Sequence, residues 1–311
     1  MKNFALMVEY DGCAFSGWQR QQNAPSVQQT LEEAIRRGLG SQVNLIGAGR
    51  TDAGVHALGQ VCNFRSDTRI PADKLPFVLN RELPHTVQVQ SAFEVPWGFH
   101  ARYLAKGKHY RYIIRVARFP SALWHHRAWQ IPYALDVEAM RKAAAALTGT
   151  HDFKAFCASG SEVKSTVRTL YRIEINRSGS EILFDFYGNG FLYNMVRILV
   201  GTLAYVGQGR ISPDQVSAIL EGADRRQAGI TAPPYGLYMV SVQYARRYIA
   251  MLHPRPWPAI RGGWHMHPTP KTKKCQLIHA YHNQARVFAL KNGKIQAEDF
   301  KRKSAKAPTN A

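Results

Sequence analysis

One segment of the chain places an acid beside a base, with glycines close on either side: Gly49-Arg50-Thr51-Asp52-Ala53-Gly54-Val55-His56-Ala57. Glycine permits sharp turns and close approach of the backbone to a ligand, so a rigid loop here can present Asp52 beside Arg50. The net charge is +20, and a protein that binds polyanions has little reason to hold a central carboxylate unless it performs chemistry. We therefore predict that Asp52 is catalytic. A carboxylate can attack an electrophilic carbon or remove a proton, and the sequence leaves both routes open.

The composition indicates a folded protein that binds a polyanion. The chain has 311 residues, with 41 Lys or Arg and 21 Asp or Glu. That length allows one large domain or two modest ones, and the basic excess favours phosphate groups. The four cysteines lie far apart and form no disulfide framework or redox motif, so we expect reduced thiols and a cytoplasmic location. The N-terminus lacks the layout of a signal peptide and no apolar run reaches membrane-spanning length, so no membrane contact is expected.

The elements that must position Asp52 follow from hydrophobic periodicity. Alternation of apolar and polar residues predicts strands over residues 4–8, 43–46, 60–64, 87–95, 108–116, 170–175, 181–187 and 236–242. Helical spacing predicts one helix capped by Ser26 and Gln29, and further helices over 74–79, 137–147, 188–203 and 213–220. Asp52 is then expected on a loop between two strands. The tyrosine-rich strand over 108–116 is expected to expose a wet, basic face.

This mixed order of strands and helices predicts an α+β fold rather than a doubly wound parallel sheet. We expect two similar α/β halves with mostly antiparallel sheets: residues 1–105, which carry the Asp52 loop, and residues 106–245. Residues 246–311 differ in character, because fourteen Lys or Arg and two acids give this segment +12 of the net charge. Repeated prolines and histidines accompany that charge, and we expect a flexible basic extension. Its Cys275 and neighbouring histidines complete no familiar zinc module, so no metal site is predicted.

Four motifs follow one another along residues 3–244 and together resemble one family. They are Phe15-Ser16-Gly17-Trp18-Gln19-Arg20-Gln21, the segment around Asp52, Phe99-His100-Ala101-Arg102 running to Tyr110-Arg111-Tyr112, and Phe191-Leu192-Tyr193-Asn194-Met195-Val196-Arg197. Their order and spacing resemble those of the tRNA pseudouridine synthases of the TruA type. The resemblance implies an isomerase with a pseudouridine synthase fold and a basic RNA-binding cleft. The reaction moves uracil from an N–C to a C–C glycosidic link without redox change, so no cofactor is required.

The same resemblance assigns roles to four residues. It places the essential aspartate at Asp52 and pairs Asp52 with Arg197, which lies in an otherwise apolar helix where an unpaired charge would be costly. It makes Tyr110 the active-site tyrosine, whose ring could stack on the target uracil and whose hydroxyl could lie near the C5 proton. Arg50 resembles the arginine that supports the extruded nucleotide. We expect the nearby guanidinium to lower the pKa of Asp52, which must be ionised in either route.

Two further expectations concern the surroundings of these residues. A basic run could track RNA phosphates; it consists of Arg102, Lys106, Lys108, Arg111 and Arg115. His56 is more typical of a residue that packs within a loop than of an acid–base catalyst.

The predicted function is isomerisation of uridine to pseudouridine at positions 38, 39 and 40 of the tRNA anticodon stem-loop. The family resemblance also implies a homodimer that binds tRNA with both subunits. Two alternatives stay open from the sequence. A non-catalytic RNA chaperone on the same scaffold would account for the charge excess, and a metal-dependent nuclease or phosphatase would use Asp52, although no second carboxylate lies near it in sequence.

Overall fold

The computed structural model describes residues 1–160, 163–245 and 248, and all of them belong to one compact unit. The extension expected over 246–311 lies outside the described residues except for Tyr248, so its flexibility stays a prediction. The division into halves at residue 105 also stays a prediction.

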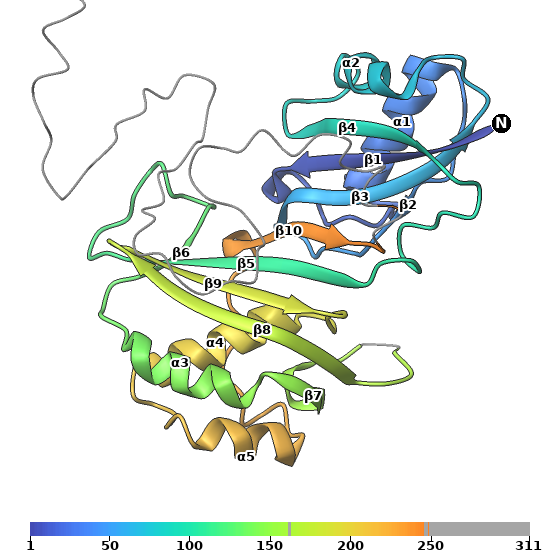
Figure 1. The fold of residues 1–311 in the computed structure, drawn as a ribbon. Helices are drawn as coiled ribbons and strands as arrows, with labels where there is room; N and C mark the ends of the chain where they lie inside the picture. The colour runs from blue at the N-terminus through green and yellow to red at the C-terminus, as the bar shows by residue number, and fades with distance from the viewer. Residues whose placement is uncertain (161–162, 246–247, 249–311) are drawn as a thin grey trace, which may run out of the picture. The chain divides into compact units, whose positions relative to one another are not determined.

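The strands of the described residues form a single ten-stranded sheet. They are β1 (Lys2–Tyr10), β2 (Ile46–Gly47), β3 (His56–Ser66), β4 (Val87–Val95), β5 (Gly107–Val116), β6 (Trp129–Ile131), β7 (Gly149–Asp152), β8 (Val167–Ser178), β9 (Glu181–Gly188) and β10 (Leu237–Gln243). The main path runs β4-β1-β3-β10-β5-β9-β8-β7, while β2 pairs with β3 and β6 with β5. Figure 1 shows β10, from the end of the described chain, lying between β3 and β5.

Most of these strand pairs are antiparallel. The exceptions are β10 with β3 and β5 with β6, which run parallel. Together with the helices described below, this arrangement confirms the predicted α+β class with mostly antiparallel strands. The β8–β9 hairpin predicted around Ser178 is also present, with Ser178 opposite Glu181.

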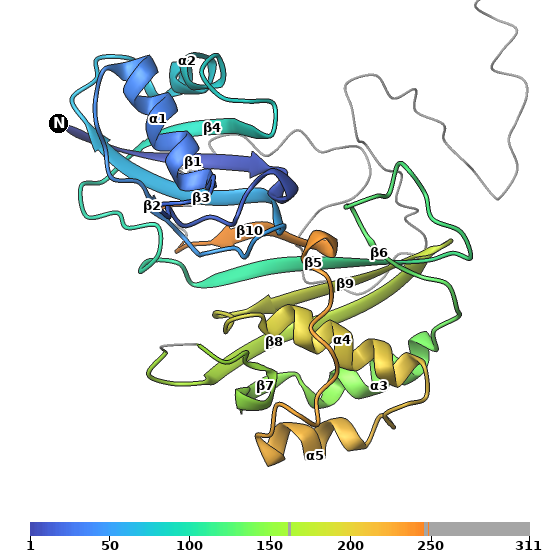
Figure 2. The ribbon, with the colours of Figure 1, turned by 180° about the vertical axis from the view of Figure 1, so that it is seen from behind.

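Five α-helices accompany the sheet in the described part of the chain. They are α1 (Val27–Leu39), α2 (Leu75–Asn80), α3 (Val137–Ala146), α4 (Met195–Gly207) and α5 (Gln215–Gly222). The predicted cap of α1 is confirmed, since the Ser26 hydroxyl accepts a hydrogen bond from the Gln29 N–H at 3.3 Å. Seen from behind, α1 and α4 both lie in front of the strands, so they cover the same face of the sheet (Figure 2).

The start of α4 differs from the prediction. The helix begins at Met195 and not at Gly188, because Asn194 adopts a left-handed conformation with φ of 58°. Asn189 is tied back to β8 instead: its N–H donates to the Thr169 carbonyl and its side-chain oxygen accepts from the Thr169 N–H, both at 3.0 Å. Apolar spacing continues through this loop because Phe191 packs on the core without being helical.

The main core lies between the sheet and its helices. Large side chains from strands far apart in sequence are fully buried there, among them Phe4, Phe64, Tyr112, Phe184 and Phe186. Burial of this apolar area holds the strand order in place and gives the loops at the strand ends a rigid base. No helix in the described part of the chain combines the length and hydrophobicity needed to cross a membrane.

Candidate active site

The loop that carries Asp52 connects β2 to β3 and is held by contacts with the first motif. The Thr51 carbonyl accepts a hydrogen bond from the Trp18 N–H at 3.0 Å, and the Thr51 hydroxyl lies 2.8 Å from the Tyr10 hydroxyl. Within the loop, the Val55 N–H donates to the Asp52 carbonyl at 3.1 Å. Thr51 is buried while the Asp52 side chain keeps 28% exposure. The backbone is therefore fixed and the carboxylate is accessible.

Gly17 shows why the first motif belongs to this site. Its φ of 102° is in the left-handed region, and a Cβ there would lie 2.7 Å from the Thr51 carbonyl oxygen. Any other residue would be strained and would push the two loops apart. Trp18, the next residue, is 2% exposed and packs against Gly47 at the end of β2. The contacts of Gly17 and Trp18 with this region thus set the position of the Asp52 loop.

Arg197 approaches Asp52 from the first turn of α4. Its Nη1 lies 3.6 Å from Asp52 Oδ2, at ion-pair distance. The guanidinium is held by two shorter bonds: Nε donates to the Ala232 carbonyl and Nη1 to Asn194 Oδ1, both at 2.7 Å. The Arg197 side chain is 15% exposed, so it is a mostly buried cation beside a partly exposed carboxylate. The structure thus places Arg197 where the predicted pairing requires it.

Arg197 acts to lower the pKa of Asp52, as expected, but burial acts in the opposite direction and outweighs it. Burial raises the pKa of the Asp52 carboxyl above its usual value, and the attraction and hydrogen bonding of Arg197 offset only part of that increase. The physical reason is that burial removes water from a charged group, while a guanidinium at 3.6 Å stabilises the charge less than direct contact would. A higher pKa makes the ionised carboxylate a stronger base and nucleophile.

Tyr110 lies on β5, close to Asp52. It is 7% exposed, and its ring packs edge-on against Phe191 with a centroid distance of 5.0 Å. Burial raises the pKa of the Tyr110 phenol strongly, and the nearby Tyr10 and the charge of Asp52 raise it further. The phenol is therefore protonated at neutral pH. It can stack or donate a proton, but it does not act as a preformed phenolate.

Arg50 occupies a different part of the loop. It is exposed, and its Nε donates a hydrogen bond to Gln19 Oε1 at 3.1 Å. The described residues show no ion pair between Arg50 and Asp52. The structure therefore brings together three predicted residues, Asp52, Arg197 and Tyr110, and leaves Arg50 on the outer surface of the loop.

The predicted basic face of β5 is wrong. Arg111 binds Asp185 through two hydrogen bonds of 2.9 and 2.7 Å, and its side chain is 12% exposed. The Arg115 side chain is 20% exposed, and its Nε lies 3.8 Å from Glu181. Neighbouring strands cover these side chains, which the sequence of one strand cannot reveal. Within the predicted basic run, only Arg102 and Lys106 are exposed; Lys108 is half-buried.

Two residues that position Arg197 were given no role from sequence. Asn194 supplies an oxygen to the guanidinium, and Ala232 supplies a carbonyl from the loop before β10. Asn three residues before an arginine is a signal for the first contact, because asparagine tolerates the left-handed conformation at a helix start. Nothing in the local sequence signals the second, which joins residues 35 positions apart.

A second polar cluster lies where the Asp52 loop enters β3, and it includes His56, the first residue of that strand. Asp11, Cys13 and His56 place possible metal-ligand atoms within 4.8 Å of one another. The contacts are already made within the protein: Asp11 pairs with Arg127 at 2.6 Å, and His56 Nδ1 accepts from the Gly12 N–H at 3.1 Å. His56 Nε2 faces two backbone carbonyl oxygens at 3.0 and 3.1 Å. His56 is 3% exposed, which agrees with its expected packing role.

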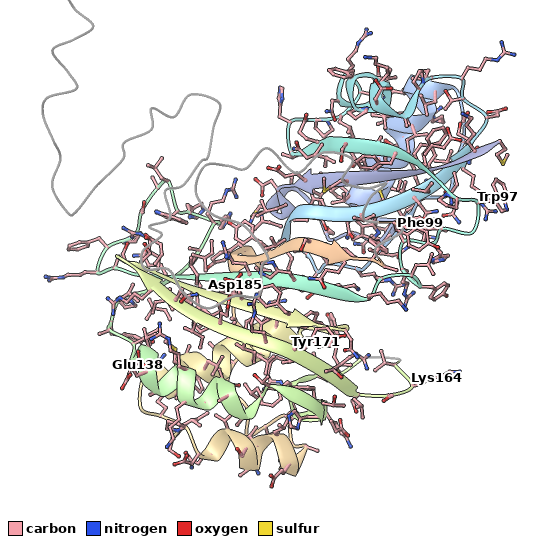
Figure 3. All side chains as sticks on the ribbon, viewed as in Figure 1. Trp97, Phe99, Glu138, Lys164, Tyr171 and Asp185 are labelled. Atoms are coloured by element: carbon pink, nitrogen blue, oxygen red, sulfur yellow. The ribbon has the colours of Figure 1, made fainter. Side chains whose placement is uncertain are left out.

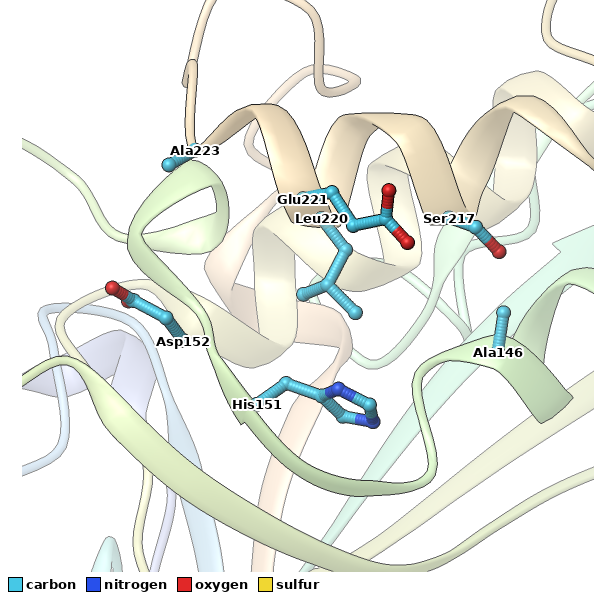
Figure 4. A pocket seen from close by; sticks show the side chains of 7 residues that line it. All are labelled: Ala146, His151, Asp152, Ser217, Leu220, Glu221 and Ala223. Atoms are coloured by element: carbon cyan, nitrogen blue, oxygen red, sulfur yellow. The ribbon is translucent and has the colours of Figure 1, made fainter.

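A pocket between α5 and β7 lies away from these residues. Figure 4 shows its lining: Ala146, His151, Asp152, Ser217, Leu220, Glu221 and Ala223. The pocket contains none of the predicted site residues, so it gives no reason to move the candidate site from Asp52.

Comparison with known proteins agrees with this geometry. The sequence pattern of the tRNA pseudouridine synthase family matches residues 6–104 and 143–245. Proteins named tRNA pseudouridine synthase A are 52% identical over 244 residues in Thermoanaerobacter sp. (strain X514) and 50% identical over 244 residues in Acetivibrio thermocellus; both matches cover 78% of this chain and 100% of the relative. The namesake from Exiguobacterium sibiricum is 45% identical, covering 78% of this chain and 97% of the relative.

The structural likeness to solved proteins is weaker. The archaeal box H/ACA sRNP Nop10–Cbf5 complex aligns with 77% of this chain and 47% of that chain, at 14% identity and a TM-score of 0.31, which is too low to support an argument. The family match and the sequence identities decide the assignment. The chain belongs to the TruA family of tRNA pseudouridine synthases, isomerases that convert uridine in tRNA to pseudouridine.

Proposed function

We propose that Asp52 is the catalytic residue of this isomerase and that the enzyme acts on positions 38, 39 and 40 of the tRNA anticodon stem-loop. The observation that supports the role of Asp52 is its setting: a carboxylate on a fixed loop, 28% exposed, 3.6 Å from the buried Arg197 guanidinium. The choice of RNA positions rests on the family resemblance of the four motifs. We also place the enzyme in the cytoplasm, where tRNA is found.

The chemistry needs a group that can act twice. The bond from uracil N1 to the ribose breaks, a bond from C5 to the same carbon forms, and the C5 proton is lost while N1 gains one. A carboxylate can assist by attacking the sugar and leaving again, or by removing a proton from it. Both routes need ionised Asp52, and a raised pKa strengthens the carboxylate in either. Arg197 keeps the ionised form available.

The target uridine must leave its stack to reach this site. Extrusion of a base costs a few kcal/mol, and an inserted side chain can offset part of that cost. Arg50 is exposed on the Asp52 loop and suits this role by position and charge. Tyr110 and its neighbour Phe191 form an aromatic pair on which the extruded uracil can stack.

We further propose a homodimer in which each tRNA contacts both subunits, as the resemblance implies. Light scattering of the purified protein should give twice the mass of 35.0 kDa. The chaperone alternative receives no support from the family assignment, because proteins of this family are named as synthases.

Tritium release from tRNA labelled at uracil C5 tests the proposal. Wild-type protein should release tritium and form pseudouridine at positions 38 to 40. Asp52→Asn should abolish release while keeping affinity for tRNA, because the amide preserves shape but can neither attack nor accept the proton. Asp73→Asn, which alters an exposed acid in the short 3₁₀ helix Ala72–Lys74, is the matched control. Turnover in the Asp52→Asn variant would overturn the assignment.

A further inference from the structure

Lys108 is a half-buried cation on the same strand face as Tyr110. It lies on β5 two residues before Tyr110, and alternate residues of a strand point to the same side. The Lys108 Nζ packs against Gly49, near the start of the Asp52 loop: a Cβ placed on Gly49 would lie 2.7 Å from this nitrogen. The ammonium group therefore sits between the strand that carries the tyrosine and the loop that carries the aspartate.

The charges around Lys108 are of the wrong sign for a structural ion pair. In the part of the chain that the structure describes, no acid forms a salt bridge with Lys108 or contributes to its electrostatics. Burial, with the nearby Arg102 and Arg168 acting in the same direction, lowers the pKa of Lys108 to about 8. A cation held partly out of water beside two others costs free energy of folding. A bound anion would offset this cost by neutralising the charge of the cations.

Arg168 and Arg102 border the same place from two other segments. Arg168 comes from the start of β8, and its Nη1 is fixed by the carbonyls of Ser165 and Val167 at 2.9 and 2.6 Å. A Cβ on Gly190 would lie 3.7 Å from Arg168 Nε. Gly190 immediately precedes Phe191, which packs on Tyr110. Arg102 is exposed, on the loop before β5. Arg102 and Arg168 thus lie close enough to Lys108 to act on its charge, and Arg168 also lies beside the residue that precedes Phe191.

We propose that Lys108, flanked by Arg102 and Arg168, binds a backbone phosphate of the RNA next to the target uridine. This inference rests on the proposed function and adds a positioning residue to it. A phosphate is the anion that every nucleotide carries into the site, and a lysine ammonium binds it as a point charge without reading the base. Held by its phosphate, the extruded nucleotide is aligned between Asp52 and Tyr110.

Lys108→Met tests the contact between Lys108 and the phosphate. A second Lys→Met variant elsewhere on the surface removes the same charge and serves as the control. Because a phosphate is bound equally in the ground state and the transition state, Lys108→Met should raise Kd and KM for tRNA about tenfold and leave kcat within about threefold. The slope of log Kd against log salt should become shallower by about one. The control is Lys142→Met, at a surface residue of α3 that pairs with Asp214. It should leave Kd, KM and the salt slope unchanged.

Thermal unfolding separates this role from a structural one. A lysine without an acid partner costs stability, so Lys108→Met should unfold at the same or a higher temperature than wild type. A lysine that served only the fold would lower that temperature when removed. Unchanged affinity, an unchanged salt slope, or a clear loss of stability in Lys108→Met would each overturn the inference.

A second measurement uses the wild-type enzyme and changes the RNA. Neutral methylphosphonate linkages are introduced one at a time around the target uridine of an anticodon stem-loop. One linkage should weaken wild-type binding about tenfold, and the same linkage should have little further effect in Lys108→Met because the contact is already absent. Equal effects at that linkage in both proteins would overturn the inference. Absence of tritium release from the wild-type enzyme would instead contradict the proposed function.

Discussion

Arg197 is bound more closely by Asn194 than by Asp52. Its Nη1 lies 2.7 Å from Asn194 Oδ1 and 3.6 Å from Asp52 Oδ2. The guanidinium is therefore held in place without the aspartate, which stays electrostatically paired but is not locked by a short hydrogen bond. A carboxylate that must attack or accept a proton benefits from this separation, because its oxygen atoms are not already engaged.

Asn194→Gly tests whether this asparagine positions the arginine. Glycine adopts the left-handed conformation of residue 194 without strain, so the substitution removes the amide oxygen and leaves the helix start unstrained. We expect kcat to fall about tenfold as Arg197 loses one of its bonds, which corresponds to about 1.4 kcal/mol. Steady-state kinetics measure the effect, and circular dichroism verifies the fold. Wild-type kcat in this variant would show that the Ala232 carbonyl alone suffices.

The pKa of Asp52 predicts a pH dependence of activity. Because burial raises this pKa, kcat/KM should fall, as pH decreases, at a higher pH than an ordinary aspartate would give. The same shift also determines how the contribution of Asp52 to folding stability changes with pH. The folded state binds the proton more tightly than the unfolded state, so ionisation of Asp52 destabilises the fold above its folded-state pKa, and this penalty disappears below the unfolded pKa.

The same shift predicts that Asp52→Asn stabilises the protein at neutral pH. Removing the buried charge should raise the midpoint of thermal unfolding by about 1 to 3 °C, and the difference from wild type should shrink as pH falls. Differential scanning calorimetry at several pH values measures it. A lower midpoint at pH 7 would mean that the attraction to Arg197 outweighs the cost of burial.

Tyr110→Phe separates the ring of Tyr110 from its hydroxyl. The phenylalanine retains packing on Phe191 and stacking on uracil, so KM should change little. If the hydroxyl takes part in loss of the C5 proton, kcat should fall about 10²-fold. Tyr112→Phe is the matched control, since the Tyr112 hydroxyl donates to the Pro233 carbonyl at 2.8 Å. That variant should lose about 1 kcal/mol of stability and keep its kcat.

Asp185, on β9, is predicted to be a stability residue on the opposite face of the sheet from Tyr110. Figure 3 marks its position on the sheet, where it accepts hydrogen bonds from His109 at 2.6 Å and from Arg111 at 2.9 and 2.7 Å. Asp185→Ala leaves a buried guanidinium without its acid and should lower the free energy of unfolding by about 3 to 5 kcal/mol. Glu174, its cross-strand neighbour, is half-buried, with a side-chain exposure of 39%, and pairs with Arg172. Glu174→Ala should cost less than about 1 kcal/mol in the same denaturant titration.

The contribution of Asp185 to the stability of the fold also depends on pH. Burial alone would raise the pKa of Asp185, but hydrogen bonds from His109 and Arg111 offset it and lower the pKa below its usual value. The stabilisation is therefore present above the unfolded pKa of about 3.9 and is lost as pH falls through the lower folded-state pKa. A wild-type protein whose stability did not decrease in acid relative to Asp185→Ala would contradict this.

Local signals in the sequence were sufficient for several parts of the fold. The period of two over 87–95 predicted β4 with its observed bounds, and Ser26 with Gln29 predicted the start of α1. The apolar spacing before Arg197 predicted a helix but placed its start too early, because hydrophobic periodicity does not report the left-handed turn at Asn194. The basic alternation of β5 predicted a wet face that the tertiary structure buries against Asp185 and Glu181.

The sequence by itself determined the family, the candidate acid Asp52 and its expected pairing with Arg197, because residue types and motif order need no coordinates. Only the tertiary structure decided how these residues are held and charged. The Ala232 carbonyl that fixes Arg197, the burial that raises the pKa of Asp52, and the placement of Lys108 against Gly49 all come from segments distant in sequence. Burial and charge–charge interactions depend on distances in space, and the chain reveals those distances only after it has folded.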